Sequence, residues 1–219
     1  MKGLLTKDFS ITMKRKSYIL LITAISMLLM LTGQSNAFVV GYLTSIAVVL
    51  CINTISNDKN DNSMAFFMTF PVSKREYVLS KYIMAGCGTA CSWVIGCIME
   101  LVYACIKGNL VGFASDIYGL LLIIFLGAVF GAIFIPIYLK FDNEQIKMIM
   151  LIIFGGIALI SVAAAVLIDF LEKIVPFNTM ELHFNLSEAA VLALILLIIA
   201  IMVIISYVTS CHIMEKKEF

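Results

Sequence analysis

Six long apolar segments constrain the fold of this chain more than any other feature of its sequence. They lie at Tyr18–Leu31, Phe38–Ser56, Val78–Ile106, Ile117–Leu139, Met148–Ile168 and Ala189–Cys211. Apolar runs of about 18 or more residues with few charges are long enough to cross a bilayer as helices. The joining segments are short, and 62% of the 219 residues are hydrophobic. We therefore expect an all-α, polytopic membrane protein with six transmembrane helices in a single domain, residues 1–219.

The basic residues are divided unevenly between the two sides that these six segments define. With both termini placed in the cytoplasm, thirteen of the 15 lysines and arginines lie on the inner side, and only Lys107 and Lys173 lie outside. Cytoplasmic loops of membrane proteins carry such an excess of Lys and Arg. We therefore predict that both termini are cytoplasmic.

An amphipathic stretch precedes the first apolar segment. In residues 1–16, Leu5, Phe9 and Met13 fall on one helical stripe while the lysines lie elsewhere. This pattern is typical of a helix that lies in the membrane interface. Because the spacing extends over three turns, it favours an interfacial helix on the inner leaflet over a basic flank that only fixes topology.

The cytoplasmic segment between the second and third apolar runs, residues 57–77, contains a possible short helix of its own. Met64, Phe67 and Met68 have the i, i+3, i+4 spacing of one helical face. Pro71 would end that helix, because the residue before a proline is biased away from helical conformation. The residues alone leave two interpretations open: a helix with an apolar face at the cytoplasmic surface, or a loop that dips its phenylalanines into the lipid headgroups.

The third apolar run begins with a helix-start signal. Ser73-Lys74-Arg75-Glu76 has the form of a capping box, in which the serine and the glutamate satisfy each other's backbone N–H groups. The run is 29 residues long, more than a bilayer needs, so we expect it to tilt or to project from the membrane.

Small residues recur at helix-packing intervals in the third and fourth runs. Gly88, Ser92 and Gly96 are spaced four apart, and Gly127 and Gly131 form a GxxxG motif. Such stripes predict close approach of helices in lipid. The sequence leaves open whether that approach is within one chain or between two.

Two other features are candidates for a translocation path. Glu100 is an ionisable residue inside a predicted span, and such residues often mark pathways. Because it lies near the outer end of its helix, a carboxylate that reaches water at a pore mouth is an equally open interpretation. The outer segment 169–187 mixes apolar and acidic residues, which fits either re-entrant helices or a surface loop.

No motif in the chain supplies catalytic or nucleotide chemistry. HExxH, GxSxG and GxxxxGK[ST] patterns are all absent from the sequence. The six cysteines lie mostly in apolar runs, and no His or carboxylate completes a four-ligand metal set, so we interpret them as packing residues. We expect no cofactor in this chain, no ATPase activity of its own, and no nucleic-acid partner.

Two stretches carry a resemblance to a known family. They read FMTFPVSKREYVLSKY at residues 67–82 and PIYLKFDNEQ at residues 136–145, where a proline is expected to end the fourth span. They resemble the permease subunits of bacterial exporter-type ABC transporters of the second permease class, whose pattern is an apolar pair, a motif close to LPVSR, a tyrosine and SKY. Asp58 or Asp61 stands where an acidic residue often opens this segment. The compact six-span chain is similar to exporters of phenol-soluble modulins and antimicrobial peptides.

The resemblance implies a pair of permease chains, identical or related, in a bacterial cell membrane. Two copies of a separate ATPase subunit would bind ATP and Mg and drive export of amphipathic peptides. A short helix within 57–77 would be the coupling helix that sits in a groove of the ATPase, and 169–187 would be the extracellular gate. The residues in contact with the ATPase would be Met64, Phe66, Phe67, Met68, Phe70, Pro71, Ser73, Lys74, Arg75 and Glu76. The gate residues would be Phe170, Pro176 and Phe177.

Two other functional classes remain as alternatives at this point. An intramembrane enzyme using Glu100 would need a second catalytic polar residue at matching depth, and the sequence offers none. A non-transporting scaffold or immunity subunit would use the small-residue stripes only to assemble a partner.

Overall fold

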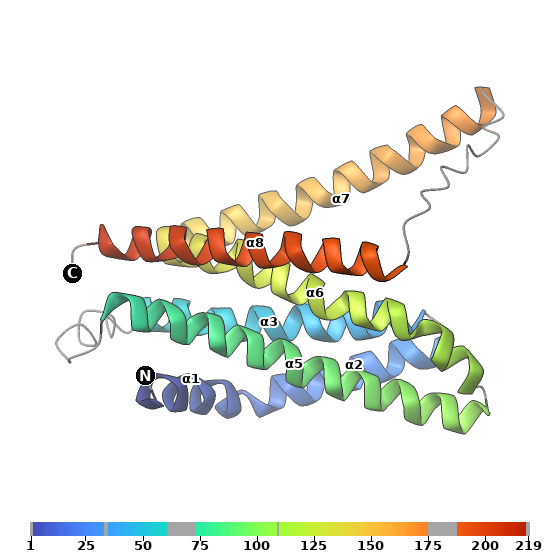
Figure 1. Cartoon of the computed structure of the whole chain (residues 1–219), viewed down its shortest axis with the longest axis horizontal. Helices are drawn as coiled ribbons and strands as arrows, with labels where there is room; N and C mark the ends of the chain where they lie inside the picture. The colour runs from blue at the N-terminus through green and yellow to red at the C-terminus, as the bar shows by residue number, and fades with distance from the viewer. Residues whose placement is uncertain (1, 33–34, 61–72, 109, 175–187, 218–219) are drawn as a thin grey trace.

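The computed structural model describes residues 2–32, 35–60, 73–108, 110–174 and 188–217. Within these ranges the chain forms seven α-helices and no strand (Figure 1), which confirms the predicted all-α fold. The helices are α1 (Lys2–Lys14), α2 (Lys16–Leu31), α3 (Asn36–Asn60), α5 (Lys74–Lys107), α6 (Leu110–Lys140), α7 (Asn143–Ile174) and α8 (Glu188–Glu215).

Four of the described helices are long and apolar enough to cross a membrane. The four candidate spans are Asn36–Lys59, Lys74–Lys107, Gly119–Lys140 and Ala193–Glu215. The other two predicted spans are not among them. Tyr18–Leu31 lies in α2, whose 16 residues extend about 24 Å against a hydrocarbon core of about 30 Å. Met148–Ile168 lies within α7, which is helical from Asn143 to Ile174.

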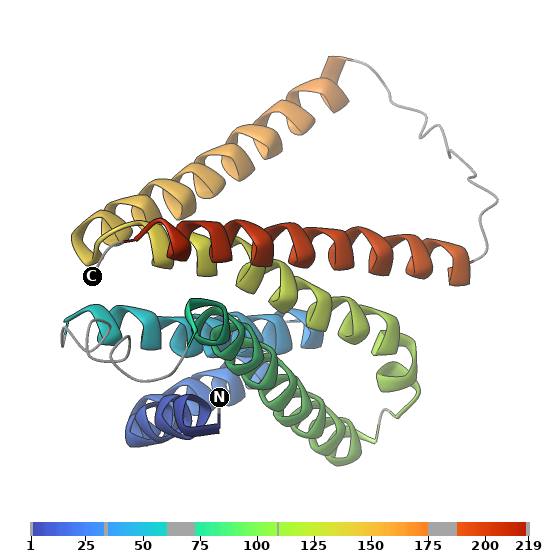
Figure 2. The same cartoon turned by 60° about the vertical axis from the view of Figure 1, so that its left-hand side comes forward.

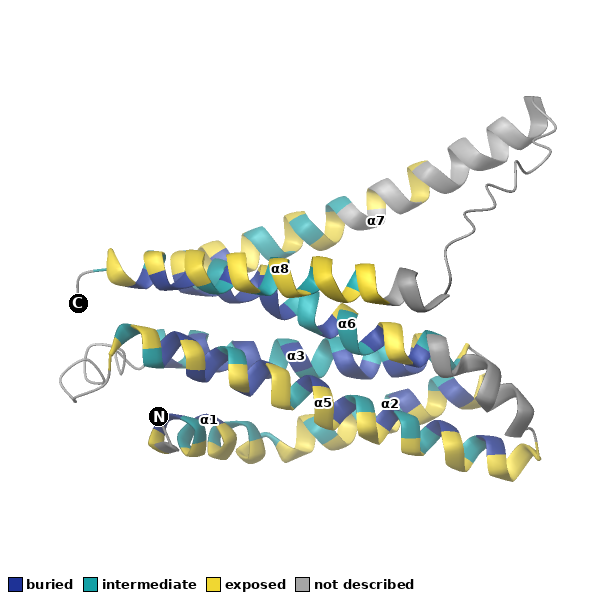
Figure 3. Cartoon of the chain, in the orientation of Figure 1, coloured by how far each residue is buried: buried dark blue, intermediate teal, exposed yellow. Residues whose placement is uncertain are grey.

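Helix α3 lies at the centre of the bundle and packs against α2, α5 and α6, while α8 packs against α6 and α5 (Figures 1 and 2). Helix α7 starts beside the end of α8 and diverges from it along its length (Figure 2). Both ends of the described chain lie at the same end of the bundle (Figure 1). Buried residues gather on the facing sides of α3, α5 and α6, and exposed ones on their outer faces (Figure 3).

The small-residue stripes permit close helix approach within this one chain. A Cβ on Gly88 would overlap Cys51 of α3, and a Cβ on Gly96 would lie 2.8 Å from a methyl group of Val40, also in α3. A Cβ on Gly127 of α6 would likewise overlap a Thr89 methyl group in α5. The predicted close approach of helices is confirmed. The stripe in α5 packs against α3, and the glycine motif in α6 packs against α5.

The expectation that a proline ends the fourth span is wrong, because α6 continues through Pro136 to Lys140. A proline inside a helix has no N–H to donate to the carbonyl four residues earlier. Here that carbonyl belongs to Ala132, and the hydroxyl of Ser206 in α8 donates a hydrogen bond to it. The helix therefore tolerates Pro136 because a neighbouring helix satisfies the carbonyl that the proline leaves free.

Helix α5 is longer than its predicted span. It has 34 residues, or about 51 Å, so it must tilt or project beyond a bilayer. It ends at Gly108, which has a φ of 71°, a left-handed conformation that glycine adopts at no steric cost.

The predicted N-terminal helix is present as α1, and the side that packs against the protein is not the apolar stripe of Leu5, Phe9 and Met13. Leu4 and Asp8 are buried, whereas Phe9 and Met13 are 54% and 50% exposed. The stripe containing Phe9 and Met13 is therefore open to the surroundings, as a helix at a membrane surface requires.

Candidate functional site

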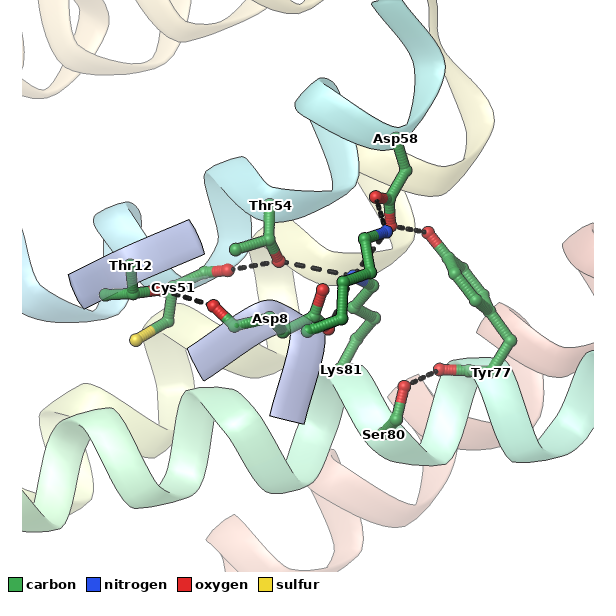
Figure 4. Close-up of polar contacts among 9 residues, drawn as sticks. Asp8, Thr12, Cys51, Thr54, Asp58, Tyr77, Ser80 and Lys81 are labelled. Atoms are coloured by element: carbon green, nitrogen blue, oxygen red, sulfur yellow. Dashed lines mark hydrogen bonds and ion pairs between the residues drawn. The ribbon is translucent and has the colours of Figure 1, made fainter. Parts of the chain in front are cut away.

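Lys81 lies in the third turn of α5 and is buried among side chains from two other helices (Figure 4). Its ammonium nitrogen is 2.7 Å from an oxygen of Asp8 in α1 and 2.8 Å from an oxygen of Asp58 in α3. It also donates a hydrogen bond to the hydroxyl of Thr54, at 3.3 Å. Lys81 therefore joins α1, α3 and α5 through ionic contacts at one end of the bundle.

Two more side chains complete this arrangement. Tyr77 lies one turn before Lys81 on the same face of α5, and its hydroxyl donates to Asp58 at 2.9 Å (Figure 4). The Lys81 ammonium lies 5.0 Å from the centre of the Tyr77 ring. Lys7 of α1 forms a further ion pair with Asp58. We call Lys7, Asp8, Asp58, Tyr77 and Lys81 the inner charge cluster.

The inner charge cluster is balanced in charge, with two carboxylates and two ammonium groups. Removing charges from water is costly, and a buried pair survives only when partners and hydrogen bonds compensate. Asp58 has three such partners, Lys7, Tyr77 and Lys81. The cluster therefore fixes the relative positions of three helices with directional contacts that apolar packing lacks.

Asp8 is the less satisfied of the two carboxylates. Its Oδ2 accepts from Lys81, while its Oδ1 is buried without a hydrogen bond from any described residue. Burial raises the pKa of the Asp8 carboxyl above its ordinary value, against the attraction of the Lys81 ammonium, which lowers it. Helix α1 contacts the inner charge cluster through the Asp8 carboxylate and through Lys7.

The start of α5 shows the predicted capping box. The Ser73 hydroxyl accepts from the Glu76 N–H at 3.2 Å, and the Ser73 N–H donates to the Glu76 carboxylate at 3.0 Å. Two of the residues predicted to contact an ATPase also have partners in this chain. The Arg75 side chain pairs with Glu215 at 2.9 Å, and Lys74 donates to the Lys217 carbonyl at 2.8 Å. The first turn of α5 is thereby attached to the end of α8.

The three residues of the SKY motif each bond to a different part of the structure. Ser80 donates to the carbonyl of Tyr77 within α5, at 2.7 Å. Lys81 belongs to the inner charge cluster. The Tyr82 hydroxyl lies 2.6 Å from the hydroxyl of Ser206 and 3.0 Å from that of Ser210, both in α8. The motif thus connects α5 to α1 and α3 on one side and to α8 on the other.

Of the ten residues predicted to contact an ATPase, four are described: Ser73, Lys74, Arg75 and Glu76. The other six lie outside the described residues, and these are Met64, Phe66, Phe67, Met68, Phe70 and Pro71. In the predicted gate segment, residues 169–174 continue α7, so that Phe170 is helical, while Pro176 and Phe177 lie outside the described residues.

The Glu100 side chain is not exposed at the surface of this chain. Its side chain is fully buried, on the same stripe of α5 as Ser92 and Gly96. Within this chain Glu100 is therefore shielded from the surroundings, and its place on a translocation path stays a prediction. One to two turns earlier on α5, Gly96 lies against Val40 of α3, and the Trp93 ring N–H donates to the Leu120 carbonyl of α6 at 2.7 Å.

The sequence alone does not indicate that Lys81 pairs with Asp8, because the two residues are 73 positions apart. One local signal was available, since Asp8 follows Leu4 by one helical turn and is the acidic residue of an otherwise basic helix. Asp58 and Tyr77 appeared only as matches to the family pattern. Their contact with each other becomes visible only when α3 and α5 are placed side by side.

Comparison with known proteins identifies the family. A family model described as ABC-2 family transporter protein matches residues 3–215. The chain belongs to the ABC-2 transporter family. It is therefore a membrane permease component of an ABC transporter, a class whose ATP hydrolysis belongs to a separate ABC ATPase partner. No curated protein and no solved structure matches the chain.

Proposed function

We propose that this chain is the membrane-spanning permease subunit of an ATP-driven exporter, and that two permease chains work with two copies of a separate ATPase. The observation that supports this proposal is the family match over residues 3–215, almost the whole chain. The resemblance of the compact chain to peptide exporters supports amphipathic peptides, of toxin or antimicrobial type, as the cargo.

The proposed topology has six spans, with both termini in the cytoplasm of a bacterial cell. It is supported by the distribution of the 15 lysines and arginines and by the position of both described chain ends at one end of the bundle (Figure 1). The segment 169–187 would then lie outside and act as the gate.

In this proposal the ATPase acts on the permease through the segment 57–77. The inner charge cluster contains Asp58 from the start of this segment and Tyr77 from its end, and these two side chains contact each other. The same cluster binds Asp8 of α1 through Lys81. A force applied to the segment would therefore move α1, α3 and α5 together, because separate movement would break buried ion pairs.

The proposal is tested by purifying the chain with an ABC ATPase whose gene lies beside its own and measuring ATP hydrolysis in liposomes. We expect the two subunits to copurify and the permease to change the hydrolysis rate. Failure to copurify, together with an unchanged rate, would favour the non-transporting scaffold and overturn the export proposal.

The coupling segment is tested by replacing Phe67 and Met68 with serine. An apolar anchor at the centre of a small interface carries much of its binding energy, so the double variant is expected to release the ATPase during copurification. Thr69→Ser, in the same segment, is the matched control and should retain it. Gel filtration checks that each variant remains folded. If the unchanged chain, the double variant and Thr69→Ser all retained the ATPase equally, the segment would not be the contact with the ATPase.

A further inference from the structure

An apolar groove lies between the N-terminal helices and α5. It has a cavity volume of about 210 Å³ and is lined by α1, α2, α3 and α5. Helix α3 contributes residues between Leu43 and Cys51 and packs against both α2 and α5. Phe9 and Met13 of α1 line the groove at the end nearest the inner charge cluster, and both are half exposed.

The groove offers no free hydroxyl to a ligand. Its three hydroxyl side chains each donate to a carbonyl of their own helix: Thr12 to Asp8 at 2.9 Å, Thr23 to Ile19 at 3.1 Å, and Ser92 to Gly88 at 2.8 Å. The remaining lining residues are apolar side chains, a glycine and cysteines. A hydrocarbon fits such a surface, whereas a polar ligand would lose hydrogen bonds to water on entering it.

The length of the groove corresponds to one leaflet of a bilayer. Along α5 its lining runs from Met84 to Ile95, which is about 16 Å of helix. The hydrocarbon core is about 30 Å thick, so one leaflet occupies about half of it. The groove therefore begins beside α1 and ends near the depth at which acyl chains of that leaflet end.

Positive charge stands at the α1 end of the groove. Lys14, Arg15 and Lys16 form the junction of α1 and α2, between the lining residues Met13 and Ile19. Arg15 donates to the side chain of Asn57 at 3.1 Å, while Lys14 and Lys16 are exposed. Basic residues at a membrane surface attract anionic lipid headgroups.

We propose that this groove binds one acyl chain of an anionic phospholipid from the leaflet in which α1 lies, and that Lys14 and Lys16 attract its phosphate. A bound lipid would fill the space between α2 and α5 and would make the position of α1 depend on the composition of the membrane. This site is separate from the contact with the ATPase, and its test needs no ATPase.

Binding is measured by native mass spectrometry of the delipidated full chain titrated with phosphatidylglycerol or phosphatidylcholine. Cys91 is exposed and lines the groove, so Cys91→Trp would fill it. We expect this variant to lose most of its affinity for both lipids, because the indole ring would occupy the space that the acyl chain fills. Ile98→Trp, at an exposed position of α5 outside the groove, should bind as the unchanged chain does.

The charge requirement is tested by Lys14→Gln combined with Lys16→Gln. We expect affinity for phosphatidylglycerol to fall about fivefold for each lysine, with little change for phosphatidylcholine. Lys147→Gln, an exposed lysine of α7, is the matched control and should leave both affinities unchanged.

Cysteine alkylation of the unsubstituted protein tests the same site without depending on whether a variant folds. Cys91 and Cys105 are both exposed cysteines of α5. Of these two, Cys91 lines the groove and Cys105 lies outside it. Phosphatidylglycerol is expected to slow alkylation of Cys91 by a maleimide and to leave Cys105 unaffected. Equal protection of the two cysteines, or equal lipid loss in Cys91→Trp and Ile98→Trp, would mean ordinary surrounding lipid and would overturn the proposal. Protection of Cys91 by an amphipathic peptide or by chain dimerisation, without protection by lipid, would overturn it as well.

Discussion

Lys81 holds two carboxylates that would otherwise be buried near each other without a shared cation. Replacing it by methionine keeps the length of the side chain and removes the charge, so that Asp8 and Asp58 lose their common partner. Removing one partner of a buried ion pair costs about 3–5 kcal/mol. We predict that Lys81→Met lowers the free energy of unfolding in detergent micelles by about this amount.

The control for this substitution is Lys147→Met. Lys147 is an exposed lysine of α7, and surface changes away from such contacts are usually within about 0.5 kcal/mol. If both variants unfolded at the same denaturant concentration as the unchanged chain, the inner charge cluster would have no stabilising role.

At the level of helices, α6 approaches α5 at Gly127 more closely than at Gly131, one turn later. A Cβ at Gly127 would overlap a Thr89 methyl group, whereas one at Gly131 would lie 3.9 Å from the Cβ of Ala85, an ordinary contact. We predict that Gly127→Ala destabilises the chain by about 1–3 kcal/mol through overpacking. Gly131→Ala should be neutral or stabilising by up to about 1 kcal/mol, because alanine is the better helix former.

Thermal unfolding of the two variants in the same detergent measures this difference. Because both glycines belong to one GxxxG motif on one helix, the comparison separates the cost of the contact from the general effect of a methyl group. Destabilisation by both substitutions to the same extent would contradict the placement of α6 against α5.

The elements that could be predicted from the sequence are those whose signals are local. The Ser73–Glu76 capping box and the N-terminal helix depend on residues within one or two turns of each other, and both are present. The contacts that define the candidate site join distant residues: Lys81 and Asp8 are 73 positions apart. Likewise, the tolerance of Pro136 depends on Ser206, which comes from another helix. Hydrophobic periodicity cannot reveal such pairs, because a buried lysine and an interfacial lysine look alike until the helices are packed.

At the scale of the whole molecule, the contacts of α5 connect the two sides of the bundle. Its first turns bind α1 and α3 through the inner charge cluster and bind α8 through Arg75 and Tyr82. Further along, the same helix packs against α3 and α6 through small residues. A movement that begins at the start of α5 would therefore act directly on α1, α3 and α8.

The number of membrane crossings depends on α2, since its 16 residues are shorter than the helix of about 20 residues that a span usually requires. A short helix can still cross when the bilayer thins locally or when its flanking residues extend to the interface. The side chains of Lys14, Arg15 and Lys16 beside α2 are long enough to extend in this way. We therefore predict that α2 crosses the membrane. Single cysteines at exposed positions, placed in a background without the native cysteines, would test this with a membrane-impermeant maleimide on intact cells. Ser35→Cys and Lys107→Cys should be labelled from outside, whereas Gly3→Cys and Asp142→Cys should react only after lysis. Labelling of Gly3→Cys and Ser35→Cys from the same side would show that α2 does not cross, and the six-span topology would then be wrong.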